Sequence, residues 1–533
     1  MRTDNVFKEW VPAWFIKAVL IYCLLPSMML LGLYNSNVTY AASYLDIEPE
    51  DMQFVMCVTY GTLFATALIE ARFFKYFSTR NYFLCIQIFT SAILIISAYT
   101  SNYYQFIFLR IAEGICMALP GVSMRMLLLS KFKSKNAIII VYSIFYGILL
   151  TSSTVTMHMM VWILDRYDWK HMAYGAALFQ VIGMALILLV FNGKRFIKKF
   201  PLYQLDWVSY ILLLTGVLCG AYVFVYGEKL YWFASVHIIV AAVVAISFGG
   251  LFVLRQLYMK RPSLNMNVLK NADLRIGLLL FLLFYISRAT LNMLHSAMGK
   301  IWNWEPIHVM HVQYINAAGI VAGLTISAIL FARGIATRYL LATGFLCLAV
   351  YHIWFTFLFV PDVSLKQISI PYFLQGTGVG MTFVPLVLFS ISTLKREDTL
   401  AGGFVTVSGR FWGTTIGFCI LQNAQVFLQQ NHYSKLQQFV SLENSETQSR
   451  LAQSAQAFMS KGYATDAANS LAIRQINSSI VNQTVLLSDM EIYTVVGCCL
   501  LVLIVLILLN QHIKHSLGLI KRRSGKYFPK TMW

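Results

Sequence analysis

The chain has 533 residues, of which 58% are hydrophobic and only 12% are charged. A soluble protein carries about a quarter charged residues, so this composition excludes a water-soluble fold and indicates an integral membrane protein. The net charge of +19 does not indicate a nucleic-acid partner, because the basic residues lie mainly between apolar runs, where they orient membrane spans. The cysteines lie inside apolar runs without metal-like spacing, so we expect no metal and no cofactor.

The chain contains many apolar runs long enough to cross a membrane. A bilayer core of roughly 30 Å needs about 20 apolar residues in a helix. The pattern therefore predicts an all-α integral membrane protein. In chain order, the fourteen predicted spans are Ala13–Leu33, Met52–Ile69, Tyr82–Thr100, Phe106–Leu129, Ala137–Leu164, Met172–Phe191, Trp207–Val225, Trp232–Leu254, Ile276–Leu294, Val309–Phe331, Tyr339–Val360, Ile370–Ile391, Phe404–Phe427 and Tyr493–Leu509.

The charged residues between the runs predict the orientation. Basic residues concentrate in alternate segments, at 72–80, 131–135, 194–199 and 255–275 and in the tail. Because positively charged loops stay in the cytoplasm, both termini are predicted to be cytoplasmic, and the first run is expected to be a retained anchor. The intervening short segments carry few basic residues, namely Arg166, Lys170, Lys229, Lys300 and Lys366.

The runs divide into two sets of six if the seventh and eighth spans form an insertion. We therefore expect an N-terminal six-helix bundle at 1–191 and a linker with two inserted spans at 192–275. A C-terminal six-helix bundle follows at 276–510, and a basic cytoplasmic tail at 511–533. The C-terminal bundle is expected to include a long external loop at 428–489.

This external loop is the only long connection between the predicted spans. The spacing of Leu436, Phe439 and Leu442 indicates an amphipathic helix, and a poorly ordered linker is the alternative. A helical loop would offer a docking element for a partner on the far side of the membrane.

The fourth predicted span contains an ion pair. Arg110 and Glu113 are one helical turn apart, so they can pair, and charges at this depth are costly unless they face a protein interior or a watery cavity. Proton binding to Glu113 would release Arg110 for another partner, as a proton-coupled switch requires. A static pair that holds helices together is the alternative. Glu70, near the cytoplasmic end of the second span, is expected to pair with Arg72 or Lys75.

A partial echo of this segment occurs in the twelfth span, and each copy combines small residues with a proline. Small residues let helices approach closely, and proline permits bending. Two similar halves around a cavity indicate a transporter. The residues expected to serve gating or packing are Gly114 and Pro120 in the first copy and Gly376, Gly378 and Pro385 in the second.

Three motifs carry a family resemblance. Arg110-x-x-Glu113-Gly114 is similar to the fourth-span motif Arg-x-x-Gln-Gly of the major facilitator superfamily, and the stretch from Gln375 to Pro385 is similar to its counterpart in the second half. The segment 408–417, with its central arginine, resembles that superfamily's glycine-rich thirteenth span. Over essentially its whole length, the chain resembles the fourteen-span drug:proton antiporters of this superfamily.

The resemblance implies a major facilitator fold with 6 + 2 + 6 helices, proton-driven multidrug efflux and a place in the bacterial inner membrane. With the long external loop, it also implies a periplasmic membrane-fusion adaptor and an outer-membrane channel as partners. The chain departs from the family pattern in three places: the loop after the second span, the fifth span, and the first span, where Tyr34 stands near the usual aspartate. Since Glu113 replaces the usual glutamine, we expect it to be the proton-binding group.

A second set of polar residues is expected to line the substrate cavity. Arg288 lies near the middle of the ninth span, and Asn292 and His295 follow on the same helical face. Interhelical hydrogen bonding is the alternative for this stripe, and a core position is the alternative for His158. The complete expected cavity set is Arg288, Asn292, His295, Gln375, His158 and Tyr34, and Arg410 and Gly417 are expected to serve gating or packing.

Charge suggests the substrate class. The predicted spans contain three embedded arginines, Arg110, Arg288 and Arg410, but a single embedded acid, Glu113. We therefore expect the substrate to be an amphipathic or anionic lipophilic compound.

A secondary active exporter driven by protons is the leading prediction, since no phosphate-binding glycine loop is present. An importer or uniporter of a metabolite is the alternative. A membrane sensor or an integral membrane enzyme is disfavoured, because no catalytic cluster is visible and two similar halves enclose a buried ion pair.

Overall fold

The computed structural model describes residues 6–33, 38–196, 199–440, 444–510 and 513. Within them the regular secondary structure is helical, and one isolated bridge joins Phe7 and Phe191. Fourteen of these helices are long and apolar enough to span a membrane, which confirms the predicted number. The chain is an all-α, multi-pass membrane protein.

The helices follow the predicted runs closely, with three differences. A short helix forms in the acidic loop after the first span, the fourth span is split in two, and the last two spans extend far beyond the membrane. The first part contains α1 Ala13–Leu33, α2 Val38–Leu45, α3 Pro49–Phe74, α4 Thr79–Tyr99, α5 Tyr103–Ala118, α6 Pro120–Lys131, α7 Ala137–Leu164 and α8 Lys170–Val190. The remainder contains α9 Trp207–Tyr226, α10 Val236–Tyr258, α11 Ala272–Lys300, α12 Pro306–Arg333, α13 Thr337–Thr356, α14 Leu365–Ser392, α15 Thr399–Phe439, α16 Ser445–Met459 and α17 Thr465–Leu509.

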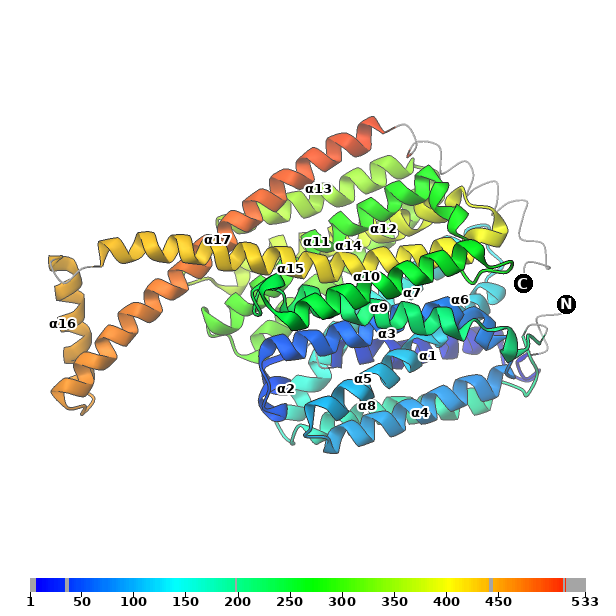
Figure 1. Ribbon diagram of the computed structural model, residues 1–533, viewed down its shortest axis with the longest axis horizontal. Helices are drawn as coiled ribbons and strands as arrows, with labels where there is room; N and C mark the ends of the chain where they lie inside the picture. The colour runs from blue at the N-terminus through cyan, green and yellow to red at the C-terminus, as the bar shows by residue number, and fades with distance from the viewer. Residues whose placement is uncertain (1–5, 34–37, 197–198, 441–443, 511–512, 514–533) are drawn as a thin grey trace.

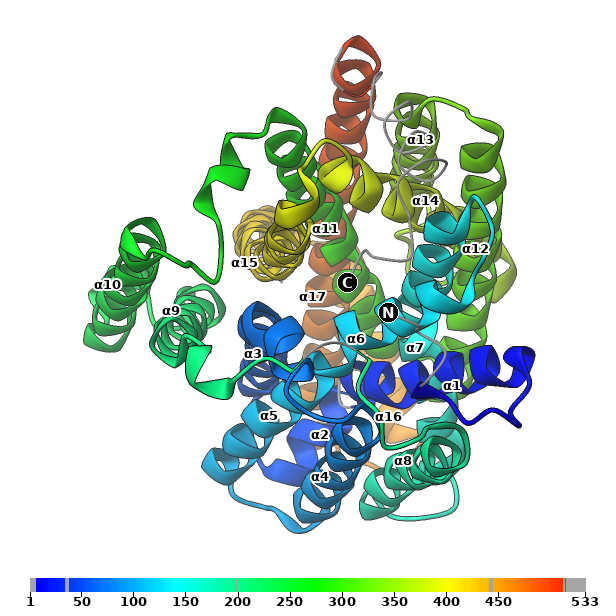
Figure 2. The ribbon, with the colours of Figure 1, turned by 90° about the vertical axis from the view of Figure 1, so that its right-hand side faces the viewer.

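Seen along the spanning helices, the two parts of the chain lie side by side (Figure 2). We call α1–α8 the N-terminal half and α11–α17 the C-terminal half. Helix α3 packs against α15 and α7 packs against α12, so the halves meet along two seams. Helices α9 and α10 lie at the flank, and α9 contacts both α3 and α15. The predicted boundaries near residues 191 and 275 stay predictions.

Polar contacts fasten the two inserted helices at their predicted cytoplasmic end. Asp206 precedes α9 and accepts hydrogen bonds from the Ser209 backbone at 3.1 Å and from Arg255 Nε at 3.2 Å. Burial alone would raise the pKa of Asp206, but these bonds outweigh it and hold the pKa below its ordinary value. Arg72 of α3 donates to Ser263 Oγ at 3.2 Å and to the Pro262 carbonyl at 3.0 Å, so the linker is bonded to the N-terminal half.

Helices α15 and α17 project beyond the ends of the other helices as a hairpin (Figure 1). They contain 41 and 45 residues, or roughly 60–70 Å of helix, about twice the thickness of the bilayer core. The tip is crossed by α16, and Tyr433 of α15 donates a hydrogen bond to Asn477 of α17 at 3.0 Å. The helical prediction for this loop is therefore confirmed for the described residues.

The closest helix packing lies around α14, whose contact with α12 is the most extensive between any two helices described. A Cβ atom added to Gly376 would stand 2.2 Å from the Asn316 carbonyl oxygen of α12, and one added to Gly319 of α12 would stand 2.2 Å from the backbone of α14. Gly378, on another face, would meet the Gly344 carbonyl of α13 at 2.9 Å. Glycine thus lets α14 contact two neighbours backbone to backbone.

Replacing Gly376 by alanine is expected to destabilise the protein by about 1–3 kcal/mol, because the added methyl group must push α14 away from α12. Thermal unfolding in detergent should show this as a lower Tm. Gly250→Ala is the matched control, since nothing lies within 4 Å of a Cβ at that helical position, and its Tm should match or exceed that of the wild-type protein. Equal Tm values for both variants would contradict the close packing.

Candidate functional site

Two arginines meet aromatic side chains from both halves near the middle of the molecule. The Arg410 guanidinium carbon, on α15, lies 5.3 Å from the ring centre of Tyr60, on α3, and 5.8 Å from that of Tyr285, on α11. The ring of Phe383, on α14, is 5.9 Å away. Such distances are those of cation–π contacts. Arg410 was expected to serve gating or packing, and the structure places it inside this aromatic cluster.

Arg288, on α11, faces the same cluster. It is close enough to Arg410, Tyr285, Tyr60 and Tyr372 to interact with each electrostatically. Among the residues that the structure describes, neither arginine forms an ion pair, and Arg288 makes no hydrogen bond. Two like charges without a counter-ion in a low-dielectric surrounding attract an anion. We call Arg288, Arg410, Tyr60, Tyr285 and Tyr372 the arginine cluster.

Two further predicted cavity residues belong to a chain of hydrogen bonds beside this cluster. His295 Nε2 lies 3.0 Å from the Tyr372 hydroxyl. Asn316, on α12, donates to the Tyr372 carbonyl at 2.9 Å and to Gln375 Oε1 at 2.6 Å. Three helices of the C-terminal half are joined in this way. Asn292 is exposed and takes no part in these bonds, so the predicted stripe on α11 is interrupted there.

The remaining predicted cavity residues lie elsewhere. His158 is exposed and hydrogen-bonded through Nδ1 to the hydroxyl of Tyr314, which joins α7 to α12 at one of the two seams. Its position is therefore that of a contact between halves, outside the arginine cluster. Tyr34 lies outside the described residues.

Arg110 and Glu113 form the predicted ion pair, and both side chains are buried. Arg110 also donates to Ser97 Oγ of α4 at 3.0 Å, and its guanidinium lies 4.8 Å from the ring centre of Phe106. These partners belong to the N-terminal half. Gly114 follows directly, and a Cβ there would stand 2.5 Å from the Thr59 carbonyl oxygen, so α5 and α3 are in backbone contact beside the pair.

The fourth span breaks between Ala118 and Pro120, more than one helical turn beyond Glu113. Helix α5 ends at Ala118, and Pro120, which has no N–H, begins α6. Tyr82 donates to the Leu119 carbonyl at 2.7 Å, and Glu70 accepts hydrogen bonds from the backbone N–H groups of Val122, at 2.5 Å, and Ser123, at 3.1 Å. Inside a membrane every backbone polar group needs a partner, and these side chains supply it.

The expectation that Glu70 pairs with Arg72 or Lys75 is therefore wrong. Glu70 is buried and points to the start of α6, whereas Arg72 turns to the linker. Sequence reasoning placed Glu70 at the cytoplasmic end, where loop cations are near, and could not see that the break at Pro120 leaves N–H groups without partners inside the bundle.

The other gating or packing residues are buried between helices of the C-terminal half. Pro385 lies inside α14, which continues to Ser392 without a break. A Cβ on Gly417 would stand 2.8 Å from Ile286 Cα, so α15 packs tightly on α11 next to the arginine cluster.

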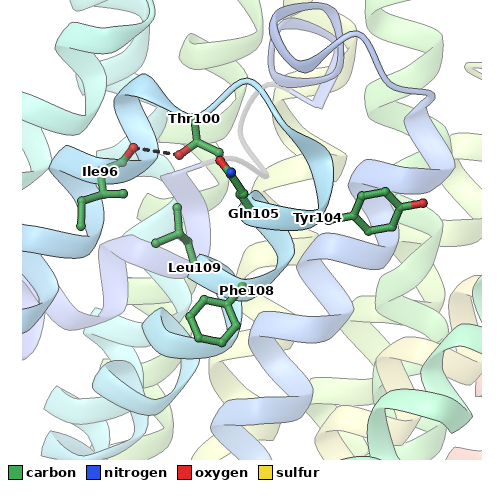
Figure 3. A pocket seen from close by; sticks show the side chains of 6 residues that line it. All are labelled: Ile96, Thr100, Tyr104, Gln105, Phe108 and Leu109. Carbon is green, nitrogen blue, oxygen red and sulfur yellow. Dashed lines mark hydrogen bonds between the residues drawn. The ribbon is translucent and has the colours of Figure 1, made fainter.

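A groove also opens on the outer flank, between α4 and α5 (Figure 3). Its volume is about 460 Å³, and its lining is mainly apolar. Phe108 and Tyr104 are 70% and 79% exposed, so the groove faces the lipid and is separate from the arginine cluster. Its lining residues are Ile96, Thr100, Tyr104, Gln105, Phe108 and Leu109.

No family model matches the sequence, but curated relatives exist. The multidrug export protein EmrB of Escherichia coli (strain K12) is 24% identical over 354 residues, which cover 65% of this chain and 66% of EmrB, just under two thirds of its length. The probable multidrug resistance protein EmrY of the same strain is 24% identical over 452 residues, or 80% of this chain and 81% of EmrY. The fatty acid resistance protein FarB of Neisseria gonorrhoeae is 24% identical over 323 residues, or 59% of this chain and 60% of FarB.

Solved structures share the fold. A POT family transporter in complex with a thioalcohol conjugated peptide has a TM-score of 0.58 and 11% identity, covering 92% of this chain and 96% of that one. The human organic anion transporter MFSD10 (TETRAN) has a TM-score of 0.52 and 12% identity, covering 77% of this chain and 93% of that one. The chain therefore shares the fold of solved membrane transporters. In sequence, the chain is similar to proteins named for multidrug export and multidrug resistance.

Proposed function

We propose that this transporter is a proton-driven exporter, in a bacterial inner membrane, of lipophilic compounds that carry an anionic group. The observation that carries the proposal is the arginine cluster, in which two cations without an acidic partner share a site with aromatic rings. A carboxylate placed there would neutralise part of the charge of Arg288 and Arg410, and the rings would contact the apolar body of the same molecule. The name of FarB, a fatty acid resistance protein, supports this substrate class.

Alternating access would use the two seams. Tyr146 of α7 and Phe383 of α14 have ring centres 4.7 Å apart, and Phe64 of α3 stacks on Phe404 of α15 at 4.9 Å. His158 and Tyr314 form a further contact between the halves. These three contacts are ring packing and a hydrogen bond, so one half can rock against the other by exchanging one set of contacts for another.

Glu113 is the proposed proton-binding group of the N-terminal half. As an anion it is held by Arg110, and protonation would remove that attraction and free Arg110, which already donates to Ser97, to turn toward another acceptor. Because Gly114, which is in backbone contact with α3, directly follows Glu113, a change at the pair acts on the packing of α5 against α3.

The hairpin of α15, α16 and α17 is the proposed docking element for the helices of a periplasmic membrane-fusion adaptor, which would lead to an outer-membrane channel. Its length carries it well beyond the bilayer, and it exposes apolar side chains that a helical partner can cover. Among these, Phe439 is 72% exposed and Ile473 is 61% exposed. Isolated exposed apolar residues are common, but these lie on one narrow projection.

Replacing Arg288 by glutamine is expected to weaken binding of laurate, used as a lipophilic anion, by about tenfold or more, because a charge-assisted contact in a desolvated site contributes about 2–5 kcal/mol. Isothermal titration of the detergent-purified protein measures it. Arg288→Lys keeps the charge and should retain more of the affinity than Arg288→Gln. If the wild-type protein bound the lipophilic cation tetraphenylphosphonium and not laurate, the substrate proposal would be wrong.

Replacing Glu113 by glutamine is expected to abolish proton-driven accumulation of laurate in proteoliposomes, because the group that binds the proton is lost while its shape is kept. Exchange of laurate at equal pH on both sides should remain. Applying a pH gradient of either sign distinguishes the proposed proton-driven exporter from the alternative, a uniporter. A uniporter would move laurate down the laurate concentration gradient regardless of pH. Proton coupling that survives unchanged in Glu113→Gln would exclude this residue.

Removing residues 434–476 is expected to leave laurate transport in proteoliposomes unchanged and to abolish protection of cells against toxic fatty acids. Tyr433 and Asn477 contact each other, so a short Gly-Ser connection can close the hairpin at its base. An adaptor that docks on the projection would be needed only in the cell, across the periplasm. Full protection by the shortened protein would count against docking there.

A further inference from the structure

A buried carboxylate of the C-terminal half has no role in the transport cycle described so far. Asp489 lies on α17 about 20 residues before its end at Leu509, or roughly 30 Å along the helix, which places it at the outer boundary of the bilayer core. Its side chain is 0% exposed. One carboxyl oxygen accepts a hydrogen bond from Gln425 of α15 at 2.6 Å, and the other, Oδ2, has no hydrogen-bond partner among the described residues.

No lysine or arginine that the structure describes forms an ion pair with Asp489. Helices α15 and α17 also carry His432 and Glu491, which pair with each other at 3.1 Å, Glu491 being partly exposed. Helix α13 contributes Tyr351 and His352, and α11 contributes His295, which is bonded to Tyr372. A carboxylate anion enclosed with a single donor and no counter-ion is costly in such a surrounding.

Tyr493 connects the surroundings of Asp489 to α11. It lies one helical turn further along α17, close enough to Asp489 to interact electrostatically. Its hydroxyl donates to the Thr290 carbonyl at 3.0 Å, and its ring is 5.1 Å from that of His352. Thr290 is two residues beyond Arg288 on the same helix. The carboxyl group is therefore joined by packed, buried side chains to the helix that bears the first arginine of the cluster.

The imidazole of His352 sits in a proton-sensitive arrangement. Nδ1 lies 2.7 Å from the Leu348 carbonyl, which only accepts, so this nitrogen carries a hydrogen. Nε2 lies 3.1 Å from Thr290 Oγ1 and 3.3 Å from the Ser287 carbonyl, and Thr290 Oγ1 in turn is 2.8 Å from that carbonyl. The Thr290 hydroxyl can give its single hydrogen either to Ser287 or to a neutral His352. The direction in which Thr290 donates, two residues beyond Arg288, therefore follows the protonation of the imidazole.

Gln425 connects Asp489 to the second arginine. Arg410 and Gln425 lie on the same unbroken helix, α15, about four turns apart and hence on nearly the same face. A displacement of α15 that accompanies binding of an anion at Arg410 would also move Gln425 away from Asp489. Both cations of the arginine cluster thus lie on helices that contact the environment of this carboxyl group.

We propose that Asp489 is a second proton-binding site of the transporter, filled from the predicted outer side past His432 and Glu491. The inference rests on the proposed proton-driven function and adds a site in the C-terminal half. In the packed arrangement of α15 and α17, Oδ2 takes a proton from external water, an O–H bond forms, and the charge of the buried carboxylate is removed. When α15 moves, water replaces Gln425, and the carboxyl group returns its proton to water.

The test uses purified full-length protein in proteoliposomes with laurate as the transported probe. In Asp489→Asn, the number of protons moved per laurate should fall, while laurate exchange at equal pH on both sides continues. Asp466→Asn is the matched control, since it removes an exposed carboxylate from the far end of the same helix, and it should keep the wild-type ratio. A wild-type ratio in Asp489→Asn would overturn the proposal.

Infrared difference spectra give a second readout that does not depend on transport. The wild-type protein should show a protonated-carboxyl band, sensitive to pH, that is missing in Asp489→Asn and present in Asp466→Asn. Gln425→Leu keeps the acid and should change the pH at which the band appears. A band unchanged in all variants would contradict the site even if Asp489→Asn folded poorly. Wild-type transport without proton movement would instead refute the proton-driven function, and the second site with it.

Discussion

The cost of holding a charge in a low-dielectric interior determines how this molecule is arranged. The ionisable groups in the membrane region differ in the partners that offset this cost. Arg110 has Glu113 on the next helical turn, and Glu70 has two backbone N–H groups at the start of α6. Arg288 and Arg410 have only aromatic rings and each other. That difference sets the partnered groups apart from the two arginines, which have no acidic partner among the described residues.

Close backbone contact is the second constraint, and it allows the polar groups to be placed. Glycines on α14, α5 and α15 let these helices touch their neighbours without intervening side chains. Tight packing within each half leaves the seams between the halves to larger aromatic residues such as Phe64, Tyr146 and Phe383. Rigid halves joined by exchangeable aromatic contacts are what a rocking motion needs.

The sequence allowed the membrane class, the number of spans and the Arg110–Glu113 pair to be predicted, because hydropathy and i,i+3 spacing are local signals. It allowed Arg288 to be singled out for the same reason. It did not reveal the arginine cluster, since Tyr60 and Arg410 are hundreds of residues apart and an aromatic residue in an apolar span carries no distinctive signal. Tyr285, which lies one helical turn before Arg288, is the one hint that was present. Glu70 was misplaced because its partners are backbone groups exposed only by the break at Pro120, and a break has no side-chain signature beyond the proline itself.

The unbroken course of α15 has a mechanical consequence. The helix carries Arg410 inside the bundle and Phe439 at the end of the projection, roughly 44 Å apart, so a tilt of about 10° around the arginine displaces the tip by about 8 Å. A small tilt of α15 within the bilayer thereby becomes a larger displacement at the end of the projection. A partner bound at the tip would therefore be displaced when substrate binding tilts α15. Conversely, a force that the partner exerts on the tip would be transmitted along α15 to the substrate at Arg410.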